Sequence, residues 1–147
     1  MLKLVVYVSE YTGNEADAAT DLNNICRHAS EFNARRNISG VLFYENYHFL
    51  QAIEGPQLEI DGLMESIRMD SRHRNIDILV EMDISSRYFS RWNMQPINLE
   101  TSSLFETKVL KKLRDAYMHN LQISDASFVM LIQDILNTPG AEEILKS

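Results

Sequence analysis

The order of β-type and helical patterns in roughly the first hundred residues is the feature that most constrains what this chain can fold into. Apolar residues follow strand-like patterns at residues 2–9, 38–44, 48–54, 76–84 and 92–97. Between these runs, apolar residues recur at helical spacing from about residue 17 to 36 and from about residue 56 to 70. The predicted order of elements is therefore βαββαββ.

This order contains two strand–helix–strand units joined by a hairpin, because only residues 45–47 separate the second predicted strand from the third. Right-handed crossovers place both helices of such a pair on the same face of the sheet. We therefore predict an α+β, ferredoxin-like βαββαββ sandwich, with a mixed five-stranded sheet and two helices on one face.

Two further amphipathic segments follow, at residues 104–121 and 124–137. An antiparallel sheet with helices on only one side leaves an apolar face open. We expect the two C-terminal helices to cover that other face or to dock a second subunit. The chain then consists of a domain at residues 1–98 and a helical extension at residues 99–147, within the same compact unit.

Composition narrows the class of protein. The chain has 147 residues, which suits one domain, and its formal net charge of −7 disfavours direct nucleic-acid binding and a membrane surface. Cys26 is the only cysteine, which excludes an internal disulfide and suits a reducing compartment. No apolar run is long enough to cross a bilayer, and Met1 leads directly into a strand-like run. We expect a soluble cytoplasmic protein without a targeting segment.

Two side-chain amides stand where apolar residues belong. Asn33 continues the apolar stripe that includes Ile25, and Gln51 shares a strand face with Phe49 and Ile53. A buried amide left without partners costs about 1–3 kcal/mol. Each amide therefore needs a polar partner, and a bound ligand is one candidate.

Plain structural roles compete with a ligand for most of these residues. Tyr7 is a favoured strand former that packs with its hydroxyl satisfied, and Asn33 is placed to cap the end of its own helix. Trp92 and Met94 are by default core residues. Gln51 has no comparable local role, although pairing with Tyr7 would satisfy part of its amide.

The motifs of common catalytic and metal sites are absent from the sequence. His28, His48, His73 and His119 are scattered without metal-ligand spacing, so we expect no metal. No GxSxG, GxGxxG or Walker sequence occurs. We therefore expect no enzyme, while an acylphosphatase-like enzyme on the same sandwich fold and a cofactor-free interaction module stay open as alternatives.

Taken together, the candidate residues converge on one place in the predicted fold. Tyr7, Gln51 and Met94 can all face the helix layer, and Asn33 points from the first helix toward the same sheet. A flat heterocycle between Ile25 and Ile67 would meet apolar walls on both sides and amides along its edge. The pattern predicts a slot for an aromatic ring.

Roughly the first hundred residues resemble the BLUF domain, a family of blue-light sensors that use FAD. The resemblance is carried by residues 4–9 with Tyr7, by residues 33–40, by residues 48–56 with Gln51, by residues 70–73 and by residues 89–94. Phe32 departs from the family, because many members carry a second asparagine there.

The resemblance implies a role for each candidate. It implies that Tyr7 and Gln51 are the photoactive pair, with Trp92 and Met94 as alternating neighbours of Gln51. It also implies an FAD site in which Gln51 and Asn33 bind the flavin edge, Ile25 and Ile67 enclose the ring, and Asp70, Arg72 and His73 lie near the ribityl and phosphate end.

By the same resemblance, light moves an electron and a proton from Tyr7 to the flavin through Gln51, and the absorption shifts slightly to the red. An amide can exchange its donor and acceptor ends with almost no change in volume, which suits Gln51 to this role. The output is expected to pass to a downstream signalling protein through altered docking of the C-terminal helices. We also expect a homo-oligomer.

Overall fold

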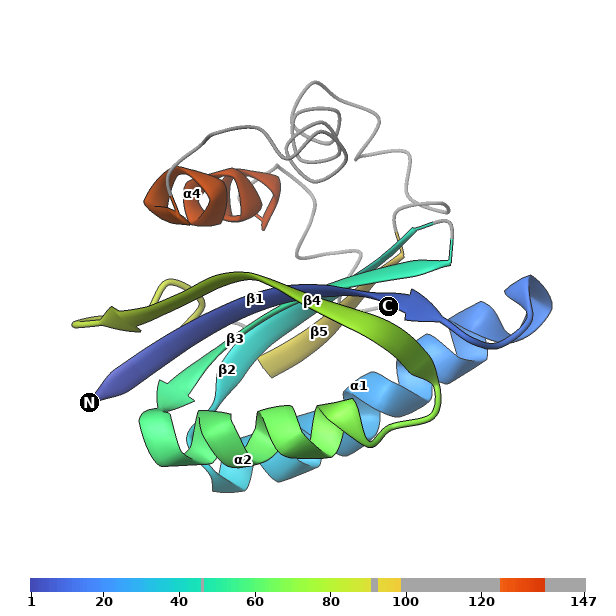
Figure 1. Ribbon diagram of the computed structural model, residues 1–147, viewed down its shortest axis with the longest axis horizontal. Coiled ribbons are helices and arrows are strands. Elements are labelled where there is room, and N and C mark those ends of the chain that lie inside the picture. Colours follow the sequence, from blue (N-terminus) through green and yellow to red (C-terminus); the bar gives the residue numbers. More distant parts are fainter. Residues whose placement is uncertain (46, 91–92, 99–124, 137–147) are drawn as a thin grey trace. The chain divides into compact units, whose positions relative to one another are not determined.

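The computed structural model describes residues 1–45, 47–90, 93–98 and 125–136. The chain divides into two compact units, Met1–Asn98 and Leu99–Ser147. The first unit runs in the order β1 (Leu2–Tyr11), a short 3-10 helix η1 (Glu15–Asp17), α1 (Ala18–Arg35), β2 (Ser39–Glu45), β3 (His48–Pro56), α2 (Gln57–Arg68), β4 (His73–Ile84) and β5 (Asn93–Asn98) (Figure 1).

The described strands form one sheet in the order β4-β1-β3-β2-β5. The pairs β1–β3, β1–β4 and β2–β3 are antiparallel, and β2–β5 is parallel. Helices α1 and α2 lie on the same face of this sheet (Figure 1). The predicted ferredoxin-like α+β sandwich is therefore confirmed for the first unit.

The end of α1 follows the backbone chemistry that the sequence indicates. The amides of Arg36 and Ile38 both donate to the Asn33 carbonyl oxygen, at 3.1 and 2.9 Å. Between them, Asn37 has a φ of 60°, the left-handed conformation that asparagine tolerates better than most residues. The helix predicted over about residues 17–36 is therefore confirmed, and it ends at Arg35.

Gly40 lies at a close approach of β2 to β3. A Cβ atom at this position would come within 2.2 Å of the Ala52 carbonyl oxygen, a distance that no side chain can occupy. The backbones of β2 and of the strand that carries Gln51 therefore lie in close contact at Gly40, where only a glycine fits.

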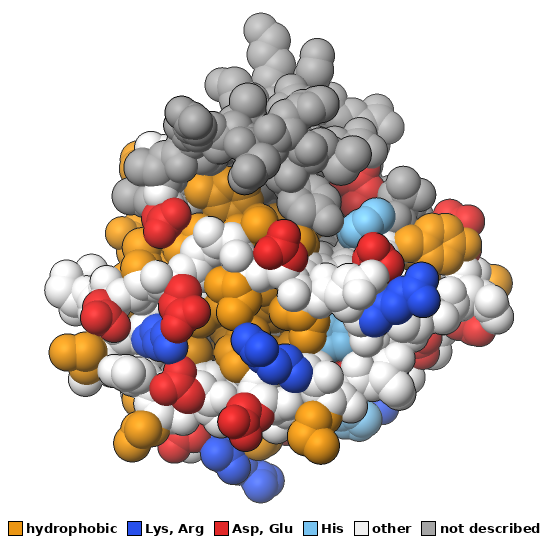
Figure 2. Space-filling view, in the orientation of Figure 1, with side chains coloured by type: hydrophobic (Ala, Val, Ile, Leu, Met, Phe, Trp, Pro, Cys, Tyr) orange, Lys and Arg blue, Asp and Glu red, His pale blue; other side chains and the backbone are white. Residues whose placement is uncertain are grey.

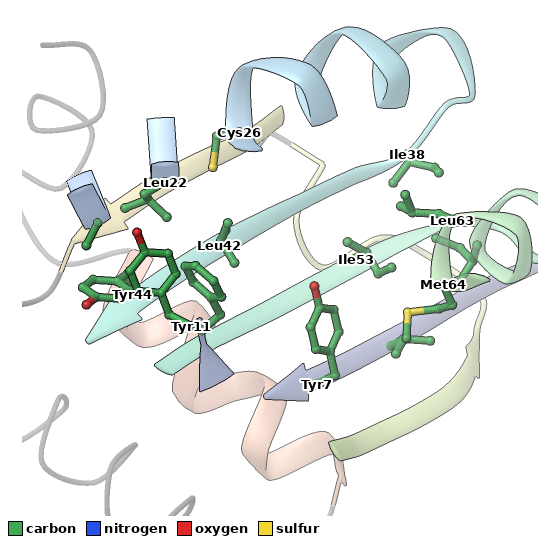
Figure 3. Packing of buried hydrophobic residues seen from close by; sticks show 14 residues of the cluster. Tyr7, Tyr11, Leu22, Cys26, Ile38, Leu42, Tyr44, Ile53, Leu63 and Met64 are labelled. Carbon is green, nitrogen blue, oxygen red and sulfur yellow. The ribbon is translucent and has the colours of Figure 1, made fainter. Parts of the chain in front are cut away.

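In the core between the sheet and its two helices, Tyr11 and Tyr44 gather at one end, and Ile38, Leu63 and Met64 lie at the other (Figure 3). Its buried members include Val5, Tyr7, Tyr11, Leu22, Cys26, Leu42, Tyr44, Phe49, Ile53, Ile60, Leu63 and Met64. Burial raises the pKa of the Cys26 thiol to about 12, so it packs as a small apolar side chain.

Strand β4 is longer than predicted, and it is only partly buried. It begins at His73, three residues before the predicted start at residue 76. Val80 is buried, but Ile76 and Ile78 are only partly covered. The reason is the position of β4 at the edge of the sheet, where one side of a strand lacks a neighbour.

The surface over β4 and α2 mixes charges of both signs around apolar patches (Figure 2). Lys3 on β1 forms ion pairs of 2.7 Å with Asp61 on α2 and 2.8 Å with Glu81 on β4. These exposed pairs contribute little to stability, about 0–1 kcal/mol each. No single-sign field dominates this face.

In the second unit the described element is α4 (Asp125–Leu136), which falls within the helix predicted at 124–137. Its buried side chains include Phe128, Val129 and Ile132. The helix predicted at 104–121 lies outside the described residues, and the covering of the second sheet face stays a prediction. Within the described ranges, no helix is both long and apolar enough to traverse a bilayer.

Candidate functional site

A cavity of about 310 Å³ lies between α1, α2 and the sheet. Its lining residues are Tyr7, Ile25, His28, Ala29, Phe32, Asn33, Leu42, Phe49, Gln51, Leu63, Ser66, Ile67, Asp70, Arg72 and His73. The volume is within the usual range for small-molecule sites. The structure thus brings together around one cavity every predicted ring-binding residue, with Tyr7 among them.

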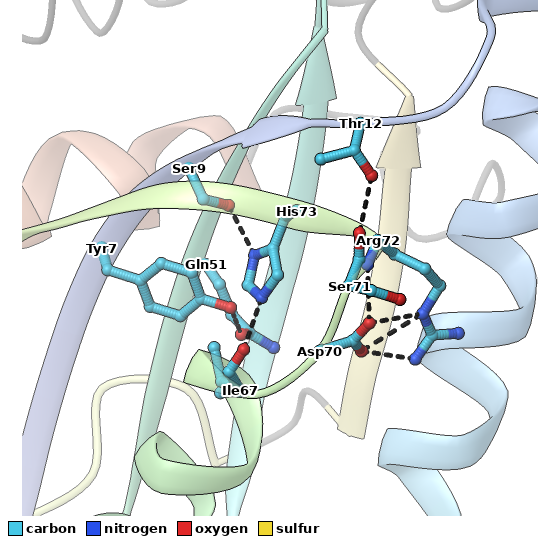
Figure 4. A network of polar contacts seen from close by, with 9 residues as sticks. All are labelled: Tyr7, Ser9, Thr12, Gln51, Ile67, Asp70, Ser71, Arg72 and His73. Carbon is cyan, nitrogen blue, oxygen red and sulfur yellow. Dashed lines mark hydrogen bonds and ion pairs between the residues drawn. The ribbon is translucent and has the colours of Figure 1, made fainter.

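Tyr7 and Gln51 form the polar pair on the sheet side of the cavity. They are directly opposite each other on β1 and β3, both are buried, and the Tyr7 hydroxyl donates to Gln51 Oε1 (Figure 4). Burial, with a smaller effect of the Asp70 carboxylate, raises the pKa of Tyr7 far above its ordinary value. Tyr7 is therefore a neutral donor, and it turns the amide nitrogen of Gln51 away from itself.

Asn33 is the clearest sign that the cavity holds a ligand. Its side chain is fully buried in the last turn of α1, and among the described residues neither its amide nitrogen nor its amide oxygen has a hydrogen-bond partner. The helix end is satisfied by backbone bonds to the Asn33 carbonyl, so the side chain does not serve as the cap. A buried amide in this state costs about 1–3 kcal/mol unless something in the cavity pairs with it.

His73 at the start of β4 is held at both ring nitrogens by the protein. Its Nε2 lies 2.7 Å from the Ile67 carbonyl oxygen and its Nδ1 lies 2.8 Å from Ser9 Oγ (Figure 4). Since a carbonyl only accepts, Nε2 carries a proton, and in the neutral ring Nδ1 accepts from Ser9. The ring lies 6.2 Å from that of Tyr7, so it forms a fixed part of the wall.

Asp70 and Arg72 form a compact charged loop at one end of the cavity. Asp70 accepts from the Arg72 backbone amide at 2.9 Å, from Nε at 3.0 Å and from Nη2 at 2.6 Å (Figure 4). The Arg72 side chain holds the pKa of the Asp70 carboxyl below its ordinary value. Thr12 ties this loop to the end of β1 through bonds of 2.7 Å to the Ser71 carbonyl and 3.0 Å to the Arg72 carbonyl.

The walls contain residues that the sequence analysis did not single out as ligand contacts. Leu42 is the β2 neighbour of Gln51, and Phe49 lies two residues before Gln51 on the same strand. The predicted hairpin and the strand alternation indicate that Leu42 and Phe49 lie beside Gln51. His28 and Ser66 carried no comparable signal, because each sits on the polar side of its helical pattern.

Trp92 and Met94 are not placed beside Gln51 by the described backbone. Trp92 lies outside the described residues, and Met94 belongs to β5, which β2 separates from β3. In the row of paired residues that contains Gln51, Leu42 is followed by Pro96 of β5. The implied contact of Met94 or Trp92 with Gln51 stays a prediction.

The site has the chemistry of a binding slot for a flat ring. Ile25 and Ile67 lie on its two helices, polar groups lie along the sheet side and on α1, and a charged loop closes one end. In the part of the chain that the structure describes, no group of three or more His, Cys, Asp or Glu residues is arranged to hold a metal ion. The fold and the site define a domain that binds an aromatic heterocycle with a polar edge.

The chain belongs to the BLUF family, described as sensors of blue light using FAD, whose family model matches residues 2–95. The family cofactor is thus FAD, and the residues present fit it. The unpartnered Asn33 amide suits the edge of a flavin ring, and the apolar walls suit its faces.

Two relatives and a solved structure illustrate the family. Photoactivated adenylate cyclase subunit beta of Euglena gracilis is 28% identical over 100 residues, covering 68% of this chain and 12% of that protein. The blue light- and temperature-regulated antirepressor BluF of Escherichia coli (strain K12) is 26% identical over 99 residues, covering 67% of this chain and 24% of that protein. The structure of the BlsA photo-activated state is 27% identical with a TM-score of 0.77, covering 93% of this chain and 96% of that one.

The chain therefore spans a small part of the length of the curated relatives that it matches, 12% in the case of the cyclase subunit. The range that the family model matches, residues 2–95, contains the two helices, the cavity residues and most of the sheet.

Proposed function

We propose that this chain is a blue-light sensor in which the cavity holds the isoalloxazine ring of FAD and the Tyr7–Gln51 pair acts as its hydrogen-bond switch. The observation that carries the proposal is the buried Tyr7–Gln51 hydrogen bond in a cavity that also contains Asn33, whose side-chain amide is unpartnered among the described residues. The Tyr7–Gln51 hydrogen bond can rearrange, and the unpartnered Asn33 amide can form hydrogen bonds with the ring.

In this proposal the other lining residues hold and orient the cofactor. Asn33 pairs with the polar edge of the ring, while Ile25 and Ile67 flank its faces. Asp70 and Arg72 lie toward the ribityl and phosphate end, where Arg72 keeps donors beyond those used on Asp70. His73 is near the same end, but its engaged ring nitrogens suit it to bracing the wall beside Tyr7.

When bound, the flavin supplies the absorption of blue light and accepts an electron. Tyr7 keeps its proton in the dark because burial raises its pKa, so the proton leaves only when an electron leaves too. That proton moves along the existing bond toward Gln51 Oε1. Once both the electron and the proton have returned to Tyr7, its hydroxyl is restored and can pair with either end of the Gln51 amide, since a hydroxyl both donates and accepts. The two pairings are the two states of the switch.

We also propose that the switched state acts on a downstream signalling protein in the cytoplasm, with this chain as a homo-oligomer. The antirepressor among its relatives is named for an action on another protein, which supports an output of this kind. The rearrangement would reach the partner through β5, the last strand of the sensor domain, and through the C-terminal helices that follow this domain in the chain.

The decisive variant is Tyr7→Phe, with Tyr11→Phe as a matched control. The Tyr11 hydroxyl donates to Asp21 at 2.5 Å and Tyr11 is not among the cavity residues, so its loss leaves the proposed switch intact. We expect Tyr7→Phe to keep the yellow colour of bound FAD and to lose the light-induced red shift completely. Tyr11→Phe should keep both. Absorption spectra before and after blue illumination measure this.

Gln51→Ala should also lose the shift, because it removes the group that rearranges. A wild-type protein that stays colourless after addition of FAD would favour a cofactor-free module, and a flavin spectrum without any reversible shift would reduce the proposal to flavin binding alone. A normal light cycle in Tyr7→Phe would overturn the assignment of the pair.

A further inference from the structure

Glu54 is a buried carboxylate that the proposed light reaction does not use. It lies on β3 three residues after Gln51, so the two side chains point to opposite faces of the strand. Its side chain is fully buried. A buried carboxylate needs several donors, because water no longer solvates it.

Three donors converge on the Glu54 carboxylate. The backbone amide of Tyr88 donates to Oε2 at 2.8 Å, and the backbone amide of Phe89 donates to Oε1 at 2.6 Å. The hydroxyl of Ser39, the first residue of β2, also donates to Oε1, at 3.0 Å. Two consecutive peptide groups of the β4–β5 connection are thus fastened to the strand that carries Gln51.

Arg87 extends the cluster to the end of α1. Its Nη1 donates to Ser39 Oγ at 2.9 Å and to the Glu54 carbonyl oxygen at 3.3 Å, while its Nη2 donates to the Asn37 carbonyl oxygen at 2.5 Å. Arg87 therefore polarises the Ser39 hydroxyl that donates to Glu54. Through its bond to the Asn37 carbonyl oxygen, Arg87 also holds the left-handed residue that follows α1.

These contacts connect both amides of the cavity to one short loop. Gln51 reaches the loop through three residues of β3 and the Glu54 carboxylate. Asn33 reaches it through the turn that ends at Asn37 and the Arg87 guanidinium. The loop residue Phe89 is fully buried, so it cannot slide without disturbing its surroundings, and β5 begins shortly afterwards, at Asn93.

We propose that Glu54 is a positioning residue of the sensor, which ties the β4–β5 loop to the strand of the Tyr7–Gln51 switch so that a rearrangement at Gln51 is transmitted to β5. This inference rests on the proposed function for the existence of the switch. It adds the physical connection by which the switch leaves the cavity. Ser39 and Arg87 support Glu54 by orienting and polarising its donors.

The test compares Glu54→Gln with Glu59→Gln in the full chain loaded with FAD. In Glu54→Gln, the new amide nitrogen replaces one of the two acceptor oxygens, so at least one of the present donors loses its partner. Glu59, the control, is a partly exposed surface carboxylate paired with Arg36. Absorption spectra report the switch itself. Hydrogen exchange of the backbone amides at 86–90 and 93–98, in the dark and under blue light, reports the loop and β5.

We expect Glu54→Gln to keep the flavin spectrum and the full red shift, because Tyr7, Gln51 and Asn33 are unchanged. In the dark, exchange at Tyr88 and Phe89 should become about tenfold faster or more, since a charge-assisted hydrogen bond is lost. The light-induced change in exchange at 93–98 should disappear. Glu59→Gln should match wild type in every measurement.

The inference would be overturned if Glu54→Gln kept an undiminished light-dependent change in hydrogen exchange at 93–98. It would also be overturned if the variant lost its red shift to the same extent as it lost folded protein, because Glu54 would then serve only the stability of the fold. If Glu54→Gln does not fold, Ser39→Ala decides, because it removes one donor and keeps the two peptide donors; it should weaken the change at 93–98 by about half. A wild-type chain without a red shift would sink the proposed function instead, while dark exchange at Tyr88 and Phe89 still reports whether Glu54 holds the loop.

Discussion

Asn33 and Glu54 are both buried polar side chains, yet they are satisfied in opposite ways. Asn33 presents an amide to the cavity and has no partner among the described residues. Glu54 is surrounded by a hydroxyl and two peptide donors from two different segments. A buried polar group that the protein satisfies holds the chain together, whereas one that the protein leaves unsatisfied is kept for a ligand.

The largest expected effect on the free energy of unfolding is at Glu54, and it tests the structural half of this comparison. Glu54→Leu leaves the Ser39 hydroxyl and the peptide amides of Tyr88 and Phe89 buried without an acceptor, so the free energy of unfolding should fall by about 3 kcal/mol or more. Glu59→Leu on the surface should change it by less than about 0.5 kcal/mol. Urea unfolding without added FAD measures both, and similar values for the two variants would contradict a structural role for the cluster.

Asn33→Leu should act in the opposite direction when FAD is absent. Replacing an unpartnered amide by an apolar side chain removes a buried cost, so the free energy of unfolding should rise by about 1–2 kcal/mol. Affinity for FAD should fall about tenfold or more, because one set of hydrogen bonds to the ring edge is lost. Asn23→Leu on the exposed side of the same helix controls for helix propensity.

Urea unfolding and FAD titration test this pair of effects. Their opposite signs are the informative result. If Asn33→Leu lowers the free energy of unfolding relative to wild type without FAD, Asn33 serves the stability of the fold, as Glu54 does.

Asp70 should show the smallest effect, and one that depends on pH. Its partly exposed pair with Arg72 lowers the pKa of the folded carboxyl below its ordinary value of 3.8. The stabilisation is therefore fully present above about pH 4 to 5 and is lost as the pH falls through the lowered pKa. Asp70→Asn should cost about 0.5–1 kcal/mol at pH 7, after solvent screening, and nothing near pH 2. Urea unfolding at a series of pH values measures the difference, and a cost that persists at low pH would assign it to packing.

The sequence was most informative where local pattern and topology agree. Strand alternation around Gln51, the apolar stripe through Asn33 and the hairpin between them fix three sides of the cavity before any coordinates are known. Asn37 and Gly40 also agree with local pattern, because a left-handed residue and a close backbone approach allow few residue types.

The sequence was least informative where partners come from distant segments. Glu54 shares a strand face with Leu50 and Ala52, a sign of a buried carboxylate, but nothing local names Ser39 or the loop amides as its donors. His73 is a polar residue after a helix, and its bonds to Ser9 and Ile67 depend on how β1, α2 and β4 meet. Local periodicity cannot report such contacts.

Strand β4 bears on whether separate molecules associate in solution. It has twelve residues, and its outer edge pairs with no other described strand. Asp77, Glu81 and Asp83 are exposed along this strand. A second copy aligning its own β4 alongside would bring like charges opposite one another as the backbones began to pair. The acidic row thus keeps the sheet from growing from molecule to molecule, and concentrated solutions of the protein should tolerate low salt better than high salt.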